Sequence, residues 1–133
     1  MPDPLDELLE AARLASRSAY CPYSNFHVGA AIRAGGRIFV GGNVENASYG
    51  LTVCAERTAA FAAILAGAGR FEAIAVACVD APNGSDPALL MPCGACRQVL
   101  SEFADPSTPV IVDRVGQMTL ADLLPMAFRL PRG

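Results

Sequence analysis

Hydrophobic and polar positions in the first third of the chain follow two different periods. Residues 4–18 carry leucine and alanine at helical spacing, with Asp3 placed to cap the helix and Pro4 in its first turn. Segments 26–33 and 37–42 are typical of β-strands, and the Ala-Gly-Gly stretch that joins them suits a hairpin. The pattern therefore predicts a helix followed by a β-hairpin.

The middle of the chain is almost continuously apolar. A helix is predicted after Thr52, which we take as its N-cap, and Gly67 and Gly69 mark its end. Beyond Arg57 this helix has no polar face, which is expected of a helix in the middle of a structure or at a subunit boundary. Residues 72–79 form the uninterrupted apolar run of a buried strand, of the kind found in parallel sheets.

The last third continues the alternation of helix and strand. A helix is predicted over 94–104, a strand over 109–113, and a terminal helix from near Thr119 to Pro125. The order helix, hairpin, helix, strand, helix, strand, helix predicts a single α/β domain over 1–133. Its helices should cover both faces of a mixed sheet.

The composition narrows the possible functions. Of the 133 residues, 53% are hydrophobic and 17% are charged, which suggests that apolar surface is buried between subunits. The net charge is −3, and the ten basic residues are arginines spread along the chain, without the basic stripe of a polynucleotide binder. No apolar run has the length of a membrane span, and the acidic N-terminus does not resemble a signal peptide. We expect a cytoplasmic protein that acts on a small molecule, and neither on nucleic acid nor at a membrane.

Three of the five cysteines stand where helices are predicted to begin. An odd number of cysteines without a secretory signal argues against a disulfide framework. Cys93 and Cys96 form a CxxC motif, a spacing used by thioredoxin-like redox sites and by zinc sites. The late position of the motif and the third cysteine, Cys54, favour a metal. Three thiolates would leave a fourth position open for water, as in catalytic zinc sites.

The other candidate ligands are interpreted as structural. His27 lies in a predicted strand, and Cys21 and Cys78 lack the spacing of metal ligands. We therefore leave these three residues out of the predicted site.

Two charged residues next to Cys54 suit a zinc site. Glu56 could accept a proton from a zinc-bound water, although by itself it would equally complement the helix dipole. Three thiolates and one Zn²⁺ carry a net charge of −1. Arg57 or Arg97 could offset that charge by donating hydrogen bonds to the thiolates.

Three segments, "NVENASYG", "TVCAERTA" and "PCGACRQVL", together resemble the small zinc-dependent cytidine deaminases. The similarity extends from about 20–26 to 123–128. Cys54 stands where the H-x-E…P-C-x-x-C signature has His, as in the three-cysteine branch of the family. The resemblance implies a three-layer α/β/α cytidine-deaminase-like fold with a five-stranded mixed sheet, one Zn²⁺ per chain, and a homotetramer whose sites are shared between subunits.

The resemblance also implies a reaction in pyrimidine salvage. Zinc-bound hydroxide would attack C4 of cytosine, while Glu56 shuttles protons to N3 and then to the departing amine. Cytidine and 2′-deoxycytidine would become uridine and 2′-deoxyuridine, with release of ammonia. The positions that match the family's substrate-binding residues are Phe26 and the backbone of Ala55 at the base, Asn43 and Glu45 at the ribose, and Ala47, Tyr49 and Phe128 toward a neighbouring subunit.

Other interpretations remain open at this point. From the residues alone, Asn43 would be a turn residue, Glu45 a solvated carboxylate, and Tyr49 and Phe128 core aromatics. A blasticidin-type deaminase shares the zinc motifs, and a structural-zinc protein or a redox protein would use the same cysteines. The chain also departs from its relatives at His27, where proline or a basic residue is common, and in ending "AFRLPRG" where "AFG" is usual.

Overall fold

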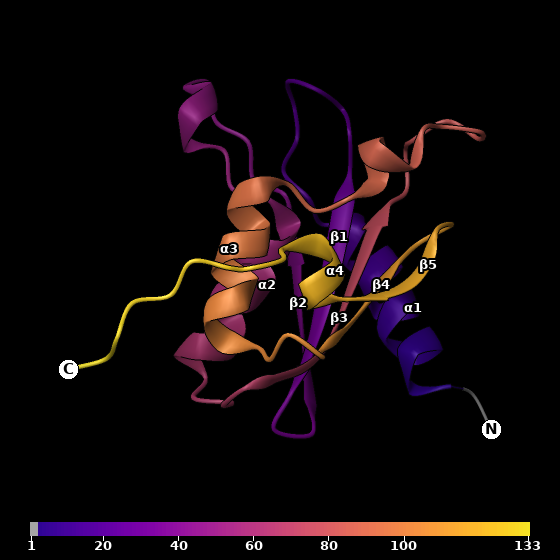
Figure 1. Cartoon of the computed structure of the whole chain (residues 1–133). Helices are drawn as coiled ribbons and strands as arrows, with labels where there is room; N and C mark the ends of the chain where they lie inside the picture. The colour runs from indigo at the N-terminus through magenta and orange to yellow at the C-terminus, as the bar shows by residue number, and fades with distance from the viewer. Residues whose placement is uncertain (1–2) are drawn as a thin grey trace.

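The computed structural model describes residues 3–133 and contains a five-stranded mixed sheet between helices (Figure 1). The strands lie in the order β2-β1-β3-β4-β5. β3 and β4 pair in parallel, and the other three neighbouring pairs are antiparallel. The strand bounds are β1 Val28–Ala34, β2 Arg37–Gly42, β3 Phe71–Cys78, β4 Pro109–Val112 and β5 Gly116–Thr119.

Helices cover both faces of the sheet. Helix α1 packs on one face, and α2 and α3 pack on the other (Figure 1). The predicted three-layer α/β/α fold with a five-stranded mixed sheet is confirmed. The helix bounds are α1 Pro4–Ser16, α2 Ala55–Leu65, α3 Gly94–Phe103 and α4 Leu120–Leu123, with short 3-10 turns at η1 Tyr49–Leu51 and η2 Pro87–Leu90.

The apolar run of β3 is explained by burial on both faces. Because side chains alternate along a strand, Ala73, Ala75 and Ala77 pack with Leu8, Leu9 and Ala12 of α1. Ile74, Val76 and Cys78 point the other way and share a core with α2 and α3. The strand is buried as predicted, and it is parallel to β4 but antiparallel to β1.

Two glycines allow the helices to approach the sheet closely. A Cβ atom on Gly29 would lie 1.8 Å from the carbonyl oxygen of Ala12 in α1. A Cβ atom on Gly41 would lie 2.4 Å from the backbone nitrogen of Ala59 and 2.5 Å from the carbonyl oxygen of Ala55. The second contact seats the first turn of α2 directly on β2, so it helps to place the residues of that turn.

Several predicted boundaries are confirmed, and one cap is wrong. Asp3 caps α1, because its carboxylate accepts a hydrogen bond from the N–H of Leu5 at 2.9 Å. Gly67 adopts φ +69° just beyond α2, as a helix-ending glycine should. The N-cap of α2 is Cys54 and not Thr52, because Thr52 follows the η1 turn with extended backbone.

Two strands differ from the pattern. β1 begins at Val28 and not at Phe26, because side chains of Ser24 and Asn43 bind the backbone of Phe26. The hydrophobic pattern alone does not predict the short strand β5; the family resemblance implied it. None of the helices within residues 3–133 is long and apolar enough to span a membrane.

Candidate zinc and substrate site

Three thiols meet where two helices begin. Cys54 is the N-cap of α2, Cys93 is the N-cap of α3, and Cys96 lies in the first turn of α3. Their sulfur atoms all lie within 4.8 Å of one another, with Cys54–Cys93 at 3.8 Å and Cys93–Cys96 at 3.4 Å. Tetrahedral Zn–S bonds of about 2.3 Å place sulfur atoms about 3.8 Å apart. The donor set and its spacing therefore fit a zinc ion.

Both ligand-bearing helices begin without a side-chain cap among the described residues. The thiols of Cys54 and Cys93 do not accept from the backbone N–H groups of their own first turns. They face each other across the site, so the N-terminal ends of the two helix dipoles lie beside the thiol cluster. This arrangement favours thiolates, the form that binds metal.

Arg57 completes the charge balance at Cys54. Its Nη2 atom lies 3.5 Å from the sulfur of Cys54. The pKa of the Cys54 thiol is lowered, first by the hydrogen bond from Cys96 and then by that from Arg57. The same contact raises the pKa of Arg57. Of the two arginines predicted to offset the thiolate charge, Arg57 makes the contact with a sulfur.

Arg97 has a different role. Its Nε atom donates to the carbonyl of Pro92 and its Nη1 atom to the carbonyl of Leu123, both at 2.8 Å. Pro92 directly precedes the first thiol of the CxxC motif, and Leu123 ends α4. Arg97 therefore fixes the backbone of the cysteine loop against the C-terminal segment.

Glu56 is buried beside the thiol cluster. Its exposed fraction is only 4%, and it lies in the first turn of α2. Burial raises the pKa of its carboxyl to about 7, and the negative charge of the Cys54 thiolate adds to the increase. A carboxyl group with a pKa near neutrality can both accept and donate a proton during a reaction.

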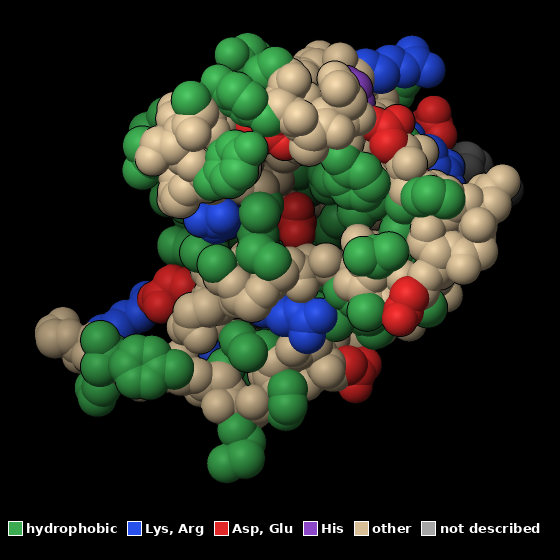
Figure 2. Space-filling view, turned by 90° about the horizontal axis from the view of Figure 1, so that it is seen from above, with side chains coloured by type: hydrophobic (Ala, Val, Ile, Leu, Met, Phe, Trp, Pro, Cys, Tyr) green, Lys and Arg blue, Asp and Glu red, His purple; other side chains and the backbone are tan. Residues whose placement is uncertain are grey.

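A cavity of about 200 Å³ joins these groups. The space-filling view shows a hollow in the surface seen from above, with hydrophobic side chains around an acidic one (Figure 2). Six predicted site residues line the cavity: Phe26, Asn43, Cys54, Ala55, Glu56 and Cys93. Sequence reasoning missed its other walls, Val28, Thr52, Val76, Cys78, Leu89 and Met91.

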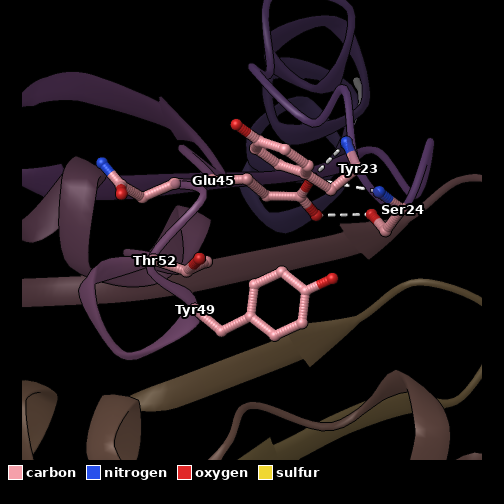
Figure 3. A pocket seen from close by; sticks show the side chains of 6 residues that line it. Tyr23, Ser24, Glu45, Tyr49 and Thr52 are labelled. Atoms are coloured by element: carbon pink, nitrogen blue, oxygen red, sulfur yellow. Dashed lines mark hydrogen bonds between the residues drawn. The ribbon is translucent and has the colours of Figure 1, made fainter.

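Glu45 lies in a neighbouring hollow of about 480 Å³ (Figure 3). Its carboxylate accepts bonds from the backbone N–H groups of Tyr23 and Ser24, at 3.0 and 3.1 Å, and from the Ser24 hydroxyl. These bonds, the hydroxyl first, lower the pKa of Glu45. Thr52 lines both hollows, so they adjoin. Tyr49 stands across the second hollow from Glu45 (Figure 3).

Asn43 is buried and already engaged with the backbone. Its Oδ1 atom accepts from the N–H of Val28 at 2.9 Å, and its Nδ2 atom donates to the carbonyl of Phe26 at 2.8 Å. The amide retains one more hydrogen and further lone-pair capacity for a ligand. The predicted contact with ribose remains a prediction.

The three residues predicted to reach a neighbouring subunit are exposed. Tyr49 is 78% exposed and Phe128 is 66% exposed, which argues against the alternative that they are core aromatics. Ala47 is exposed in the same loop as Tyr49. Phe128 is held through its backbone, since its carbonyl accepts a bond from Gln98 at 3.2 Å.

The residues left out of the predicted site have structural positions. Cys21 and Cys78 are buried free thiols, as expected of core residues. Cys78 also lines the cavity, and burial raises the pKa of its thiol to about 11. His27 lies outside the thiol cluster and contacts Asp80. The alternation of β3 could have revealed Cys78, because it shares a face with Val76.

Comparisons with known proteins agree with this site. The family profile "Cytidine and deoxycytidylate deaminase zinc-binding region" matches residues 3–112. The cytidine deaminase of Mycobacterium tuberculosis (strain ATCC 25618 / H37Rv) is 49% identical over 121 residues, covering 90% of this chain and 85% of that protein. That of Sporosarcina psychrophila is 43% identical over 130 residues, covering 93% and 90%. The crystal structure of cytidine deaminase from Burkholderia pseudomallei has a TM-score of 0.81 at 47% identity and covers 92% of this chain and 98% of that one.

The matched zinc-binding region contains all three clustered thiols and Glu56. The profile covers well over half of the chain, and the thiol spacing independently fits the metal. The site is therefore that of one zinc ion per chain, and the chain belongs to the cytidine deaminase family.

Proposed function

We propose that this chain catalyses the zinc-dependent hydrolysis of cytidine and 2′-deoxycytidine to uridine and 2′-deoxyuridine, with release of ammonia, as in pyrimidine salvage. The observation that carries the proposal is the meeting of three thiols and a buried carboxyl in one cavity. Relatives of similar length that match along most of the chain are named cytidine deaminases.

The chain's own residues divide the chemistry between them. Cys54, Cys93 and Cys96 hold the zinc ion, which supplies a Lewis acid that lowers the pKa of water. Glu56, with its pKa near 7, accepts one proton of the attacking water and delivers it to N3, and then moves the second proton of that water to the departing amine, which leaves as ammonia. Arg57 keeps the thiolate charge from weakening the metal as an acid.

The two adjoining hollows suit the two parts of a nucleoside. Phe26 and the backbone of Ala55 contact the base in the cavity that contains Glu56. Asn43 and Glu45 bind the ribose hydroxyl groups. The hydrogen bond from Ser24 lowers the pKa of Glu45, so this side chain is a carboxylate that can accept bonds from those hydroxyl groups. Thr52 lies where base and sugar meet, because it lines both hollows.

The charges favour a nucleoside over a nucleotide. Neither hollow has Arg among the described residues that line it, while Glu45 is an anion there. A 5′-phosphate would therefore meet repulsion without a compensating cation. The same argument disfavours a polynucleotide substrate.

The exposed apolar side chains support assembly. Leu65 is 91% exposed and Phe61 is 49% exposed on α2, the helix that has no polar face beyond Arg57. We place these side chains in the interfaces of a homotetramer, in which Ala47, Tyr49 and Phe128 complete a neighbouring subunit's site. The free thiols of the metal site suit a reducing compartment, so we place the enzyme in the cytoplasm.

An assay of several substrates tests the proposal. The purified protein is incubated with cytidine, 2′-deoxycytidine, cytidine monophosphate and blasticidin S, while ammonia release and zinc content are measured. We expect ammonia from the two nucleosides and one zinc per chain. Ammonia from blasticidin S alone would indicate the blasticidin-type enzyme. Zinc without activity would indicate a structural metal, and a reversible Cys93–Cys96 disulfide without zinc would indicate redox chemistry.

A further inference from the structure

The loop at residues 21–28 carries Phe26 and is held by side chains from other segments. Glu45 accepts two backbone N–H bonds near its start, and Asn43 binds the backbone on both sides of residue 27. Both of these side chains are substrate residues in the proposed function. A third side chain, that of Asp80, holds the loop from the turn that follows β3.

Asp80 makes a double contact with His27. Its Oδ2 atom accepts the backbone N–H of His27 at 2.7 Å and lies 2.6 Å from Nδ1 of the ring. These bonds, the backbone bond first, lower the pKa of Asp80. The side chains of His27 and Asp80 are 39% and 40% exposed, so the pair lies at the protein surface.

The contact between Asp80 and His27 joins two segments that line the cavity containing Glu56, where the proposed function places the base. His27 directly follows Phe26, and Asp80 comes two residues after Cys78; Phe26 and Cys78 both line the cavity. Neither His27 nor Asp80 belongs to the described residues that line it. The contact therefore acts on the cavity only through its neighbours. It ties the loop to the turn after β3, a strand that pairs with β1 on one side and β4 on the other.

We propose that Asp80 is a positioning residue that, through His27, sets Phe26 against the pyrimidine ring and so determines affinity for the nucleoside. The proposal rests on the proposed function, because it assigns the base to this cavity. Asn25, just before Phe26, adopts φ +56°, a left-handed conformation that turns the chain immediately before Phe26. Asn adopts this conformation more readily than most other non-glycine residues.

The test compares Asp80→Ala, Asp80→Asn and, as a control, Asp6→Ala, which removes an exposed carboxylate on α1. We expect Asp80→Ala to raise KM for cytidine about three- to tenfold and to change kcat less than about twofold. Asp80→Asn retains an oxygen acceptor for both contacts, so its KM should lie within about twofold of the parent value. Asp6→Ala should leave both constants unchanged.

A double-mutant cycle separates positioning from general destabilisation. If Asp80 acts through Phe26, adding Asp80→Ala to Phe26→Ala should raise KM no further. A full additional rise in KM, or a loss of kcat with unchanged KM, would overturn the proposal. Should Asp80→Ala fold poorly, His27→Ala serves instead, since it removes the ring contact and keeps the backbone bond.

Hydrogen exchange gives a readout that does not depend on activity. Asp80→Ala should speed exchange of the amide of His27 and its loop neighbours, while α1 exchanges as in the parent. Unchanged exchange in the loop would overturn the anchoring, whether or not the protein is active. A parent protein that does not deaminate cytidine would instead refute the proposed function, which the Asp80 variants do not test.

Discussion

The first turns of α2 and α3 contribute different things to one zinc site. The first turn of α2 brings a single thiol together with Glu56, which is buried, and Arg57, which contacts the thiol of Cys54. The first turn of α3 brings two thiols and Arg97, whose guanidinium binds backbone carbonyls. In the proposed function, the start of α2 therefore supplies one zinc ligand, the proton shuttle and the charge balance, and the start of α3 supplies the other two zinc ligands.

The two arginines stand at different helical positions relative to their N-cap cysteines. Arg57 comes three residues after the N-cap Cys54, and Arg97 comes four residues after the N-cap Cys93. Successive residues are about 100° apart around a helix, so the two arginines leave their helices in different directions relative to the N-cap cysteine. Similar motifs at two helix starts thus do not imply similar roles for their arginines.

The largest expected effect comes from removing the carboxyl group of Glu56 at the start of α2. Glu56→Gln should lower kcat by about 10³-fold or more, because the amide cannot transfer the proton. Zinc content and unfolding temperature should remain near the parent values, since the metal ligands are untouched. Steady-state kinetics and metal analysis check this, with Glu72→Gln, an exposed residue of β3, as the control. A nearly normal kcat would remove Glu56 from the reaction.

A smaller effect is expected when Arg57 no longer offsets the charge of the Cys54 thiolate at the start of α2. Arg57→Gln should reduce kcat about 10- to 100-fold, because the Cys54 thiolate loses its cationic neighbour. Arg132→Gln removes an arginine whose side chain is 76% exposed and should leave kcat unchanged. Full activity of Arg57→Gln would mean that the helix dipoles suffice for charge balance.

Removing the corresponding arginine at the start of α3, Arg97, should affect the retention of zinc and not the turnover number. Arg97→Met removes both carbonyl contacts and frees the backbone before Cys93. We expect zinc to pass to a chelator about tenfold faster, while kcat per zinc-loaded chain changes less than about twofold. Arg97→Lys, which can restore one contact, should give an intermediate rate. Normal zinc retention with reduced kcat would show that Arg97 contributes to turnover and not to retention of the metal.

The smallest effect is expected at α4, a helix start without chemistry. Thr119 and Asp122 form a capping box there, unlike the cysteines that begin α2 and α3. Thr119→Ala should lower the free energy of unfolding by about 1 kcal/mol without changing zinc content or kcat. Chemical denaturation of the zinc-loaded protein measures this change.

The capping box also has a defined dependence on pH. Bonds from the backbone N–H and then the hydroxyl of Thr119 lower the pKa of Asp122 in the folded chain. Its stabilising contribution is therefore complete above the unfolded pKa of about 4 and is lost as pH falls through the lower folded value. The stability difference between parent and Thr119→Ala should shrink in that acidic range. A difference that stays constant there would argue against the carboxylate's part in the cap.

The sequence by itself determined the local elements and the reactive groups. Helical spacing and the Asp3 cap located α1, because such patterns depend on residues three or four apart. The helices that follow Cys54 and Cys93 were also predicted, with the cap of the first misplaced at Thr52. The clustered cysteines and Glu56 were recognisable because their chemistry is specific and their motifs are contiguous. The fifth strand came only from the resemblance, since four residues carry too little periodicity to be seen.

Only the tertiary structure decided which residues from different helices, strands and loops come into contact. It separated the role of Arg57 from that of Arg97, placed Cys78 and Met91 in the cavity walls, and brought Asp80 to His27. These contacts join residues on different elements, whose separation depends on sheet order, strand register and how closely each helix approaches the sheet. Local periodicity gives the direction of a side chain around its own helix or strand. It does not say which distant segment that side chain will meet.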